Sequence, residues 1–369
     1  MKREVPFFNY PRAYLDHRED LLKIFDEVGK RGAFIMQKDL KDFELYLAKY
    51  TGAKYAIGVA NATDGLELAW LAIGLKPGDE VICCSHTMLA TASSIRTAGG
   101  TPIPVELGED NLIDPEAIEN SINKKTVGIM PTQLNGRTCN MDRIMSIENK
   151  YNLFVVEDAA QALGSKFKGQ HAGTFGQASA ISFFPAKVLG CLGDGGGVIT
   201  NDYGIFDKVY QLHDHGRDID GEVKSWGRNS RLDNLQAAIL NYHFESYDQV
   251  ILRRRYIADI YQSRLGDLIE LQLPPSTASN KDHFDIYQNY ELQADRRDEL
   301  KEHLKINGIG TLIQWGGKAV HQWEQLGFNV KLPKTEKFFE RCIMLPMNMF
   351  ISDDDAHYVC DQIIAFYGK

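Results

Sequence analysis

Long apolar runs, a basic surplus and metal-binding motifs are all missing from this sequence. No stretch of about 20 consecutive apolar residues is present, so a membrane-spanning helix is not expected. The first residues, Met1-Lys-Arg-Glu-Val-Pro6, do not resemble a signal peptide, and we therefore expect a cytoplasmic protein. A formal net charge of −9 argues against a nucleic-acid-binding surface, because such surfaces are strongly basic.

Cysteines are few and are not arranged for metal binding. The six cysteines include no Cys-x-x-Cys pair, and no histidine lies near them at the spacing of a zinc site. The neighbours Cys83 and Cys84 should point to opposite faces of a strand, so they cannot hold one ion together. We expect reduced, mostly buried thiols and predict neither a disulfide nor a metal site.

The residues that are present indicate a folded α/β protein. Hydrophobic residues make up 44% of the chain, and 18 Phe with 16 Tyr exclude a disordered protein. Short apolar strands alternate with helical patterns, which predicts a large, doubly wound, mostly parallel sheet. At 369 residues the chain exceeds one core, so we expect a large domain over residues 1–240 and a smaller C-terminal α+β domain over 241–369. One long helix, Asn234 to about Leu265, should link them.

Two strand ends carry the residues with the clearest chemistry. An apolar strand from Phe154 ends in Glu157 and Asp158, and 29 positions after Asp158 a second strand delivers Lys187 to a glycine-rich loop. Taken singly, such an acid often caps a helix and such a lysine is usually a solvated loop charge. Together they suit pyridoxal phosphate: the amine forms a Schiff base, and the acid keeps the pyridine nitrogen protonated.

A turn over residues 61–65 follows another predicted strand and opens a helix that we expect to begin at Leu66. Free backbone N–H groups at a helix N-terminus favour an anion, so this turn predicts a phosphate site. Thr63 and Asp64 are candidate helix caps, and capping alone would explain them equally well. The loop Gln133-Leu-Asn-Gly136 ends a further strand and should border the same pocket.

Three segments resemble the DegT/DnrJ/EryC1/StrS family of sugar aminotransferases, which are fold-type I enzymes that use pyridoxal phosphate. They are Glu157-Asp-Ala-Ala-Gln-Ala, Ser182-Phe-Phe-Pro-x-Lys187 and Gly195-Gly-Gly-Val-Ile-Thr200. The resemblance extends from about Phe34 to the C-terminus. It implies that Lys187 and Asp158 are catalytic, with Lys187 also moving a proton between the amino donor and the cofactor.

The same resemblance implies the other cofactor contacts. Gln161 should bond the phenolic oxygen of the ring, and Ser182 should bond the phosphate together with the turn at Ala62, Thr63 and Asp64. Met88 stands where related proteins have an aromatic residue over the ring; His86 could stack there instead, or Met88 could be ordinary core. Asn229 matches an asparagine that reaches the phosphate of the partner subunit, which implies a homodimer with shared active sites.

The substrate side is less defined. Arg231 is a candidate for an anionic group of the donor or the sugar. Relatives usually carry His-Tyr-x-Pro in the smaller domain, whereas this chain has the run from Gln314 to His321, which makes Gln314, Trp315, Lys318 and His321 weaker candidates. The expected partners are L-glutamate and a nucleotide-linked keto-sugar, for amino sugars of a surface polysaccharide or a secondary metabolite.

The segment Leu189 to Gly196 resembles relatives that aminate C3, so a 3-keto-6-deoxyhexose is the preferred substrate. Small residues at 190, 193 and 195 should let this loop lie close to the cofactor. Amination at C4 or of a cyclitol stays open. A pyridoxal phosphate-dependent sugar dehydratase of the same family would carry histidine in place of Lys187, and a non-catalytic sugar-binding protein would not need the intact set Asp158, Gln161 and Lys187.

Overall fold

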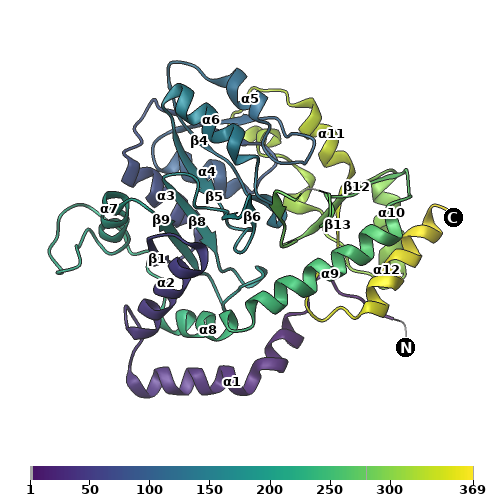
Figure 1. Cartoon of the computed structure of the whole chain (residues 1–369), viewed down its shortest axis with the longest axis horizontal. Coiled ribbons are helices and arrows are strands. Elements are labelled where there is room, and N and C mark those ends of the chain that lie inside the picture. The colour runs from purple at the N-terminus through teal and green to yellow at the C-terminus, as the bar shows by residue number, and fades with distance from the viewer. Residues whose placement is uncertain (1–2, 280, 369) are drawn as a thin grey trace.

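A seven-stranded sheet forms the centre of the computed structural model, which describes residues 3–279 and 281–368. The strand order is β1-β9-β8-β5-β4-β2-β3, and only β9 runs against its neighbours β1 and β8. The predicted fold-type I architecture, with a mostly parallel doubly wound sheet, is confirmed. Helices cover both faces of this sheet, and the smaller part of the molecule lies to one side of it (Figure 1).

Strand and helix bounds follow the alternation read from the sequence. The strands of the large sheet are β1 Tyr55–Val59, β2 Glu80–Cys84, β3 Thr101–Val105, β4 Thr126–Met130, β5 Phe154–Asp158, β8 Ala178–Ser182 and β9 Gly196–Thr200. The helices of this part are α1 Tyr10–Arg31, α2 Lys38–Thr51, α3 Ala62–Ile73, α4 Leu89–Thr97, α5 Pro115–Ser121, α6 Met141–Tyr151, α7 Tyr203–His213 and α8 Asn234–Phe244.

The smaller part is built on a three-stranded antiparallel sheet of order β10-β12-β13. Its elements are α9 Tyr247–Leu265, β10 Leu271–Gln272, β12 Tyr290–Ala294, α10 Arg297–Ile306, α11 Pro333–Arg341, β13 Cys342–Leu345 and α12 Asp353–Phe366. A second small sheet joins β11 His283–Phe284 to the hairpin of β6 Lys166–Phe167 and β7 Gln170–His171. This sheet brings residues that precede β12 against loops of the large sheet.

Two local predictions are wrong. The single linking helix is in fact two helices, α8 and α9, which are separated at Glu245 and Ser246. Helix α3 begins at Ala62 and not at Leu66, and Asn61 is its N-cap because the Asn61 side chain accepts a hydrogen bond from the backbone N–H of Asp64 at 2.9 Å. Thr63 and Asp64 therefore lie in the first turn and do not cap the helix.

Core packing crosses the predicted domain boundary at residue 240 in two places. Val5, near the N-terminus, packs in the core of the smaller part with Tyr261 and Tyr290. Conversely, Phe338 and Phe339 of α11 pack with Ile82 and Ile129 of the large sheet. The division into residues 1–240 and 241–369 stays a prediction. The contacts show that the N-terminal segment packs on the smaller part and that α11 packs on the large sheet.

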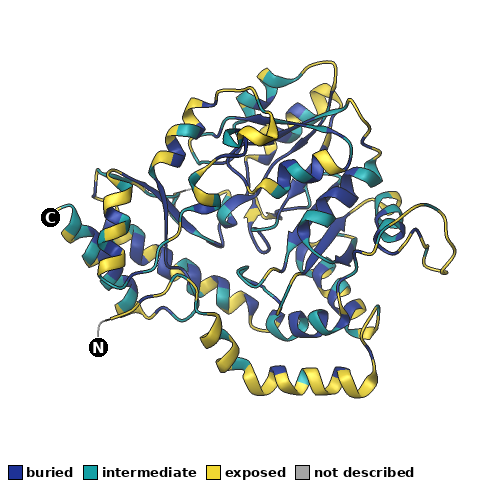
Figure 2. Cartoon of the chain, turned by 180° about the vertical axis from the view of Figure 1, so that it is seen from behind, coloured by how far each residue is buried: buried dark blue, intermediate teal, exposed yellow. Residues whose placement is uncertain are grey.

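The six cysteines are all buried, as expected for thiols that serve as small apolar side chains. Among the described residues, no helix is long and apolar enough to cross a bilayer. The buried residues concentrate in the sheet and its inner helix faces, whereas the outward face of α1 is exposed along its length (Figure 2).

Candidate active site

The strand register brings the predicted site residues to one edge of the sheet. Asp158 at the end of β5 is paired with Ala180 of β8. Ser182 at the end of β8 lies opposite Gly196 of β9, and Val59 at the end of β1 lies opposite the same glycine. Because β1, β5 and β8 run parallel to one another, their carboxyl ends and the start of α3 meet at this edge.

Asp158 is a deeply buried acid with neutral partners. Only 3% of the residue is exposed, and its carboxylate accepts hydrogen bonds from Thr91 Oγ1 at 2.6 Å and from the backbone N–H of Ala160 at 3.2 Å. Burial raises the pKa of Asp158, whereas the Thr91 hydroxyl, the Ala160 N–H and the Lys187 amine oppose that rise. The carboxylate makes no ion pair with any residue in the described ranges, which leaves it able to bind a cation.

Lys187 lies in the irregular loop between β8 and β9. Its amine makes no hydrogen bond or ion pair within residues 3–279 and 281–368. Although the residue as a whole is only half-buried, protein atoms crowd the amine, and this desolvation lowers the pKa of Lys187 to about 8, against the opposing charge of Asp158. The neutral form of the amine, which a nucleophile or a general base requires, is therefore far more populated near physiological pH than for an ordinary lysine.

One pocket collects residues from three of these segments. Gln161, Ser182 and Lys187 line it together with Gln288 from the smaller part. The side-chain oxygen of Gln161 accepts a hydrogen bond from the backbone N–H of Asn135 at 2.9 Å. Since this bond fixes the oxygen on the Asn135 side, the Gln161 amide nitrogen is left to donate a hydrogen bond to a ligand.

The first turn of α3 supplies the anion-binding end of the site. Within the described part of the chain, the backbone N–H groups of Ala62 and Thr63 have no acceptor, because Asn61 satisfies the N–H groups of Asp64 and Gly65. A side chain at residue 196 would collide with Asn61, since a Cβ built on Gly196 lies 2.4 Å from the Asn61 carbonyl carbon. Glycine at this position therefore allows the helix start to lie against the sheet edge beside Ser182.

These residues fit pyridoxal phosphate. The buried, unpaired carboxylate of Asp158 matches a protonated ring nitrogen, and the free amine of Lys187 matches an aldehyde carbon. Gln161 offers a donor for the phenolic oxygen, while the N-terminus of α3 and Ser182 offer donors for the phosphate. The set thus provides a partner for each polar end of the cofactor.

Comparison with known proteins identifies the family. The model of the DegT/DnrJ/EryC1/StrS aminotransferase family matches residues 16–364. The chain belongs to this family. The predicted activity of a pyridoxal phosphate-dependent sugar nucleotide aminotransferase is thereby confirmed.

Full-length relatives support the assignment. The chain is 35% identical over 368 residues to a pleiotropic regulatory protein of Geobacillus stearothermophilus, with 98% of each protein covered. It is 34% identical over 364 residues to the dTDP-3-amino-3,4,6-trideoxy-alpha-D-glucose transaminase of Streptomyces venezuelae, covering 97% of this chain and 95% of that protein. The crystal structure of DesV from S. venezuelae superposes with a TM-score of 0.94 at 33% identity, over 99% of both chains.

The residue that covers the cofactor ring in this aminotransferase is still a prediction. Met88 is the N-cap of α4 and is 52% exposed, so its thioether is free to cover a ring. His86 is not free, because it is only 1% exposed. Its ring centre lies 4.3 Å from that of Phe338, and its Nε2 lies 3.3 Å from a carboxylate oxygen of Glu291. This placement removes the alternative that His86 stacks on the ring.

Asn229 and Arg231 lie on the outer side of β1. Arg231 bridges to Val59, and its guanidinium donates to Asp214 at 2.8 Å and to the Asn229 side chain at 3.1 Å. Asn229 itself is exposed. The segment between α7 and Asn229 projects from the body of the molecule (Figure 1). Their predicted roles toward a partner subunit and an anionic substrate stay predictions.

The run from Gln314 to His321 is largely engaged in packing. Gln314 is buried and donates to Asn135 at 3.1 Å, and Trp315 packs edge-on against His86. His321 hydrogen-bonds Ser85 at 2.6 Å, and the Lys318 amine lies 5.0 Å from the ring centre of Trp323. Residues 311–314 form no strand, and the edge of the small sheet is instead β13, which pairs with β12.

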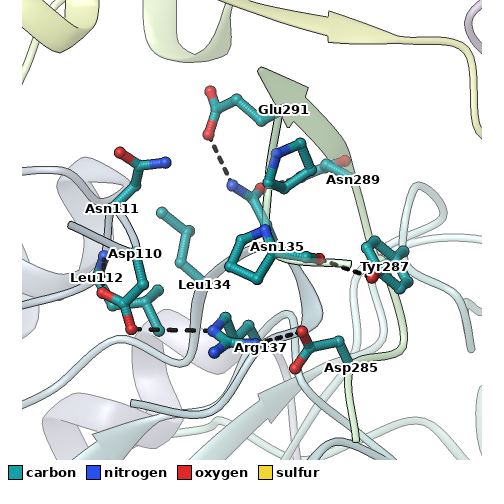
Figure 3. Close-up of a pocket in the computed structure, with 12 residues that line it drawn as sticks. Asp110, Asn111, Leu112, Leu134, Asn135, Arg137, Asp285, Tyr287, Asn289 and Glu291 are labelled. Carbon is teal, nitrogen blue, oxygen red and sulfur yellow. Dashed lines mark hydrogen bonds and ion pairs between the residues drawn. The ribbon is translucent and has the colours of Figure 1, made fainter. Parts of the chain in front are cut away.

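Asn135, whose backbone N–H donates to Gln161, also lines a second hollow (Figure 3). Arg137 lies there between Asp110 and Asp285, and Asn135 donates to Glu291 at 2.6 Å. Leu134 and Asn135 line this second hollow and not the pocket that contains Lys187, so the bordering of the cofactor pocket by the 133–136 loop stays a prediction. The sequence reading missed Thr91 and Gln288, because neither carries a local pattern that points to the cofactor.

Proposed function

We propose that Lys187 and Asp158 carry the reaction of this aminotransferase. When bound, pyridoxal phosphate supplies an electron sink that stabilises negative charge at the carbon bearing the amino group. The Lys187 Nζ would hold the cofactor between turnovers. It would also move a proton from the donor carbon to the cofactor and, in the reverse direction, from the cofactor to the acceptor carbon. Its lowered pKa of about 8 keeps it able to accept that proton.

Asp158 keeps the cofactor in its reactive form. An ionised carboxylate in this buried position favours a protonated ring nitrogen, because few other charges screen the pair. Thr91 and the Ala160 N–H stabilise the charged form of the carboxylate and fix its orientation. The single observation that carries this proposal is a buried acid without an ion pair, close to a lysine amine that has no hydrogen-bond partner and a lowered pKa.

For the substrates, we propose L-glutamate as donor and C3 of a nucleotide-linked 3-keto-6-deoxyhexose as acceptor. Support comes from the S. venezuelae relative, whose name specifies a 3-amino sugar. The small residues of the Leu189–Gly196 loop support it less than expected. A Cβ at Gly190 would lie 2.9 Å from the Phe184 carbonyl oxygen, and one at Gly195 would lie 2.8 Å from the Cys191 sulfur. These glycines therefore serve the packing of the loop itself.

The acceptor position is tested directly. The enzyme is incubated with glutamate and, separately, with 3-keto and 4-keto nucleotide sugars, and the new C–N bond is located by NMR. We expect amination at C3. Amination only at C4, or only of a keto-cyclitol in a parallel incubation, would overturn the assignment. Recovery of a dehydrated, unaminated sugar would instead support the dehydratase alternative.

A homodimer with shared sites is proposed from the outer side of β1. Asn229 is exposed there, and the adjoining segment exposes Ile219, Val223 and Trp226, the last at 95%. Apolar side chains of this size are seldom left to solvent together, which favours a second copy of the chain as their cover. Mixing inactive Lys187→Ala and Asn229→Ala chains should restore activity through hybrid dimers. Hybrid dimers without activity would contradict shared sites.

A further inference from the structure

A side chain from the smaller part of the molecule holds the peptide groups on both sides of Lys187. The side-chain nitrogen of Gln288 donates to the carbonyl oxygen of Ala186 at 2.9 Å. Its side-chain oxygen accepts from the backbone N–H of Val188 at 3.0 Å. Gln288 is only 6% exposed, so water competes little for these two hydrogen bonds.

Gln288 is itself fixed from behind. The guanidinium of Arg254 on α9, a residue 7% exposed, donates to the backbone oxygens of Tyr287 at 2.8 Å and of Gln288 at 2.6 Å. The loop after β4 also packs tightly against this segment. A Cβ added at Gly136 would lie only 2.6 Å from the backbone nitrogen of Gln288. The amide of Gln288 therefore has a rigid base outside the lysine loop.

The lysine loop has little else to hold it at this point. Residues 183–195 contain no helix or strand, and the nearest backbone bond at the lysine runs from its own N–H to the Phe184 oxygen at 2.8 Å. One further side chain supports the loop in a similar way. Gln236 accepts from the backbone N–H of Leu192 at 2.9 Å, five residues beyond the lysine and from α8 of the large part.

We propose that Gln288 is a positioning residue that sets the place of the Lys187 amine by clamping the peptide groups on either side of it. The inference rests on the proposed role of Lys187 and deepens it. Gln288 acts through the lysine backbone and takes no proton itself. Because the clamp comes from the smaller part of the molecule, the position of the amine depends on the docking of that part against the large sheet.

Three variants test the clamp. Gln288→Met keeps length and volume and removes both hydrogen bonds. Gln288→Asn keeps the amide and is one methylene too short to reach both peptide groups, so it should give a smaller effect. Gln236→Met is the matched control, because it removes a side-chain bond to the same loop away from the lysine. Thermal unfolding of each cofactor-free protein reports whether the fold is kept.

The first measurement uses protein without cofactor or substrate. Lys187 is reductively methylated with formaldehyde and cyanoborohydride over a pH series, and the extent is mapped by mass spectrometry. The wild-type midpoint should lie at about 8. Gln288→Met should move it upward by about one pH unit, because a freed amine gains water and its pKa rises toward the ordinary value. Gln236→Met should leave it in place.

The second measurement is turnover of the cofactor-bound enzyme. Gln288→Met should lower kcat roughly ten- to hundred-fold, with KM for the donor changed less than about threefold, because misplacement affects the chemical step more than binding. An unchanged methylation profile in Gln288→Met would overturn the proposal, as would an equal shift in Gln236→Met. If Gln288→Met does not fold, Gln288→Asn decides by the same profile. The methylation profile does not depend on the aminotransferase reaction. A wrong assignment of the activity would therefore leave the profile unaffected.

Discussion

Strand β5 ends in two acids, Glu157 and Asp158, whose surroundings differ. Glu157 and Asp158 are consecutive, so their side chains point to opposite faces of the sheet. Both are almost completely buried, at 0% and 3% exposure. They differ in what surrounds the carboxylate, and this difference separates a structural acid from a chemical one.

Glu157 is saturated with donors. Its two oxygens accept from the backbone N–H groups of Gly173 at 2.6 Å, Phe175 at 2.7 Å and Gly176 at 2.9 Å, and from the side chain of Gln133 at 2.7 Å. Burial raises its pKa, and these four donors oppose that rise. Glu157 therefore ties the loop before β8 to the sheet and has no remaining capacity for a ligand.

Asp158 has two neutral donors and a free amine nearby. Burial alone therefore does not distinguish a catalytic acid in this protein. Asp158 is distinguished because its carboxylate can still accept hydrogen bonds and pair with a positive charge. Changes on the Asp158 face should therefore reduce turnover while the fold is kept, and changes on the Glu157 face should reduce stability.

The largest effect is expected at the amine that faces Asp158. Lys187→Ala removes both the cofactor attachment and the proton carrier, and it should lower kcat by about 10⁴-fold or more. Far-ultraviolet circular dichroism and thermal unfolding should stay close to the wild type, since the amine makes no described hydrogen bond. Borohydride reduction of the wild type followed by peptide mapping should place the cofactor on Lys187; a label on another lysine would refute the assignment.

Asp158→Asn should be the next most severe change. It keeps the shape and the hydrogen bond from Ala160 and removes the charge, so kcat should fall about 10²- to 10³-fold while the cofactor stays bound. The measurement is steady-state turnover beside the absorption spectrum of the bound cofactor. Near-normal turnover would show that the charge at this position is not needed.

Glu157→Gln tests the other face. The new amide nitrogen faces backbone N–H groups that then lack an acceptor, and the free energy of unfolding should fall by about 2–4 kcal/mol. Denaturant unfolding of the cofactor-free protein measures this loss. Turnover per folded molecule at low temperature should change far less than in Asp158→Asn, and a reversed order of the two variants would break the comparison.

The smallest effect is expected at the hydroxyl behind Asp158. Thr91 lowers the pKa of Asp158, so Thr91→Val should raise that pKa. Because the ionised carboxylate is the active form, the acidic limb of the pH–kcat profile should move to higher pH. Thr91→Ser keeps the hydroxyl and should restore the wild-type limb. A valine variant with an unmoved limb would show that the hydrogen bond does not tune the acid.

Sequence reasoning succeeded where the signal is local. Lys187 was found because it follows an apolar strand at the carboxyl edge of a parallel sheet, and Gln161 and Ser182 were implied by the resemblance to the aminotransferase family; the structure places all three in one pocket. Sequence reasoning failed where the correct residue has neighbours that are equally suitable, and where the outcome depends on packing against distant residues. Asn61 caps α3 instead of Thr63 or Asp64, and the break between α8 and α9 has no glycine or proline to announce it.

What the sequence by itself determined is the alternation of strands and helices and the order acid, then amine, on two strand ends. Apolar periodicity and strand-end position are properties of short segments, so no distant residue is needed to recognise them. Only the tertiary structure showed that Glu157 is saturated with hydrogen-bond donors, and that Gln288, 102 positions from Ala186, clamps the lysine loop. Such contacts depend on how the smaller part docks on the sheet, and that docking is encoded by the packing of many residues at once.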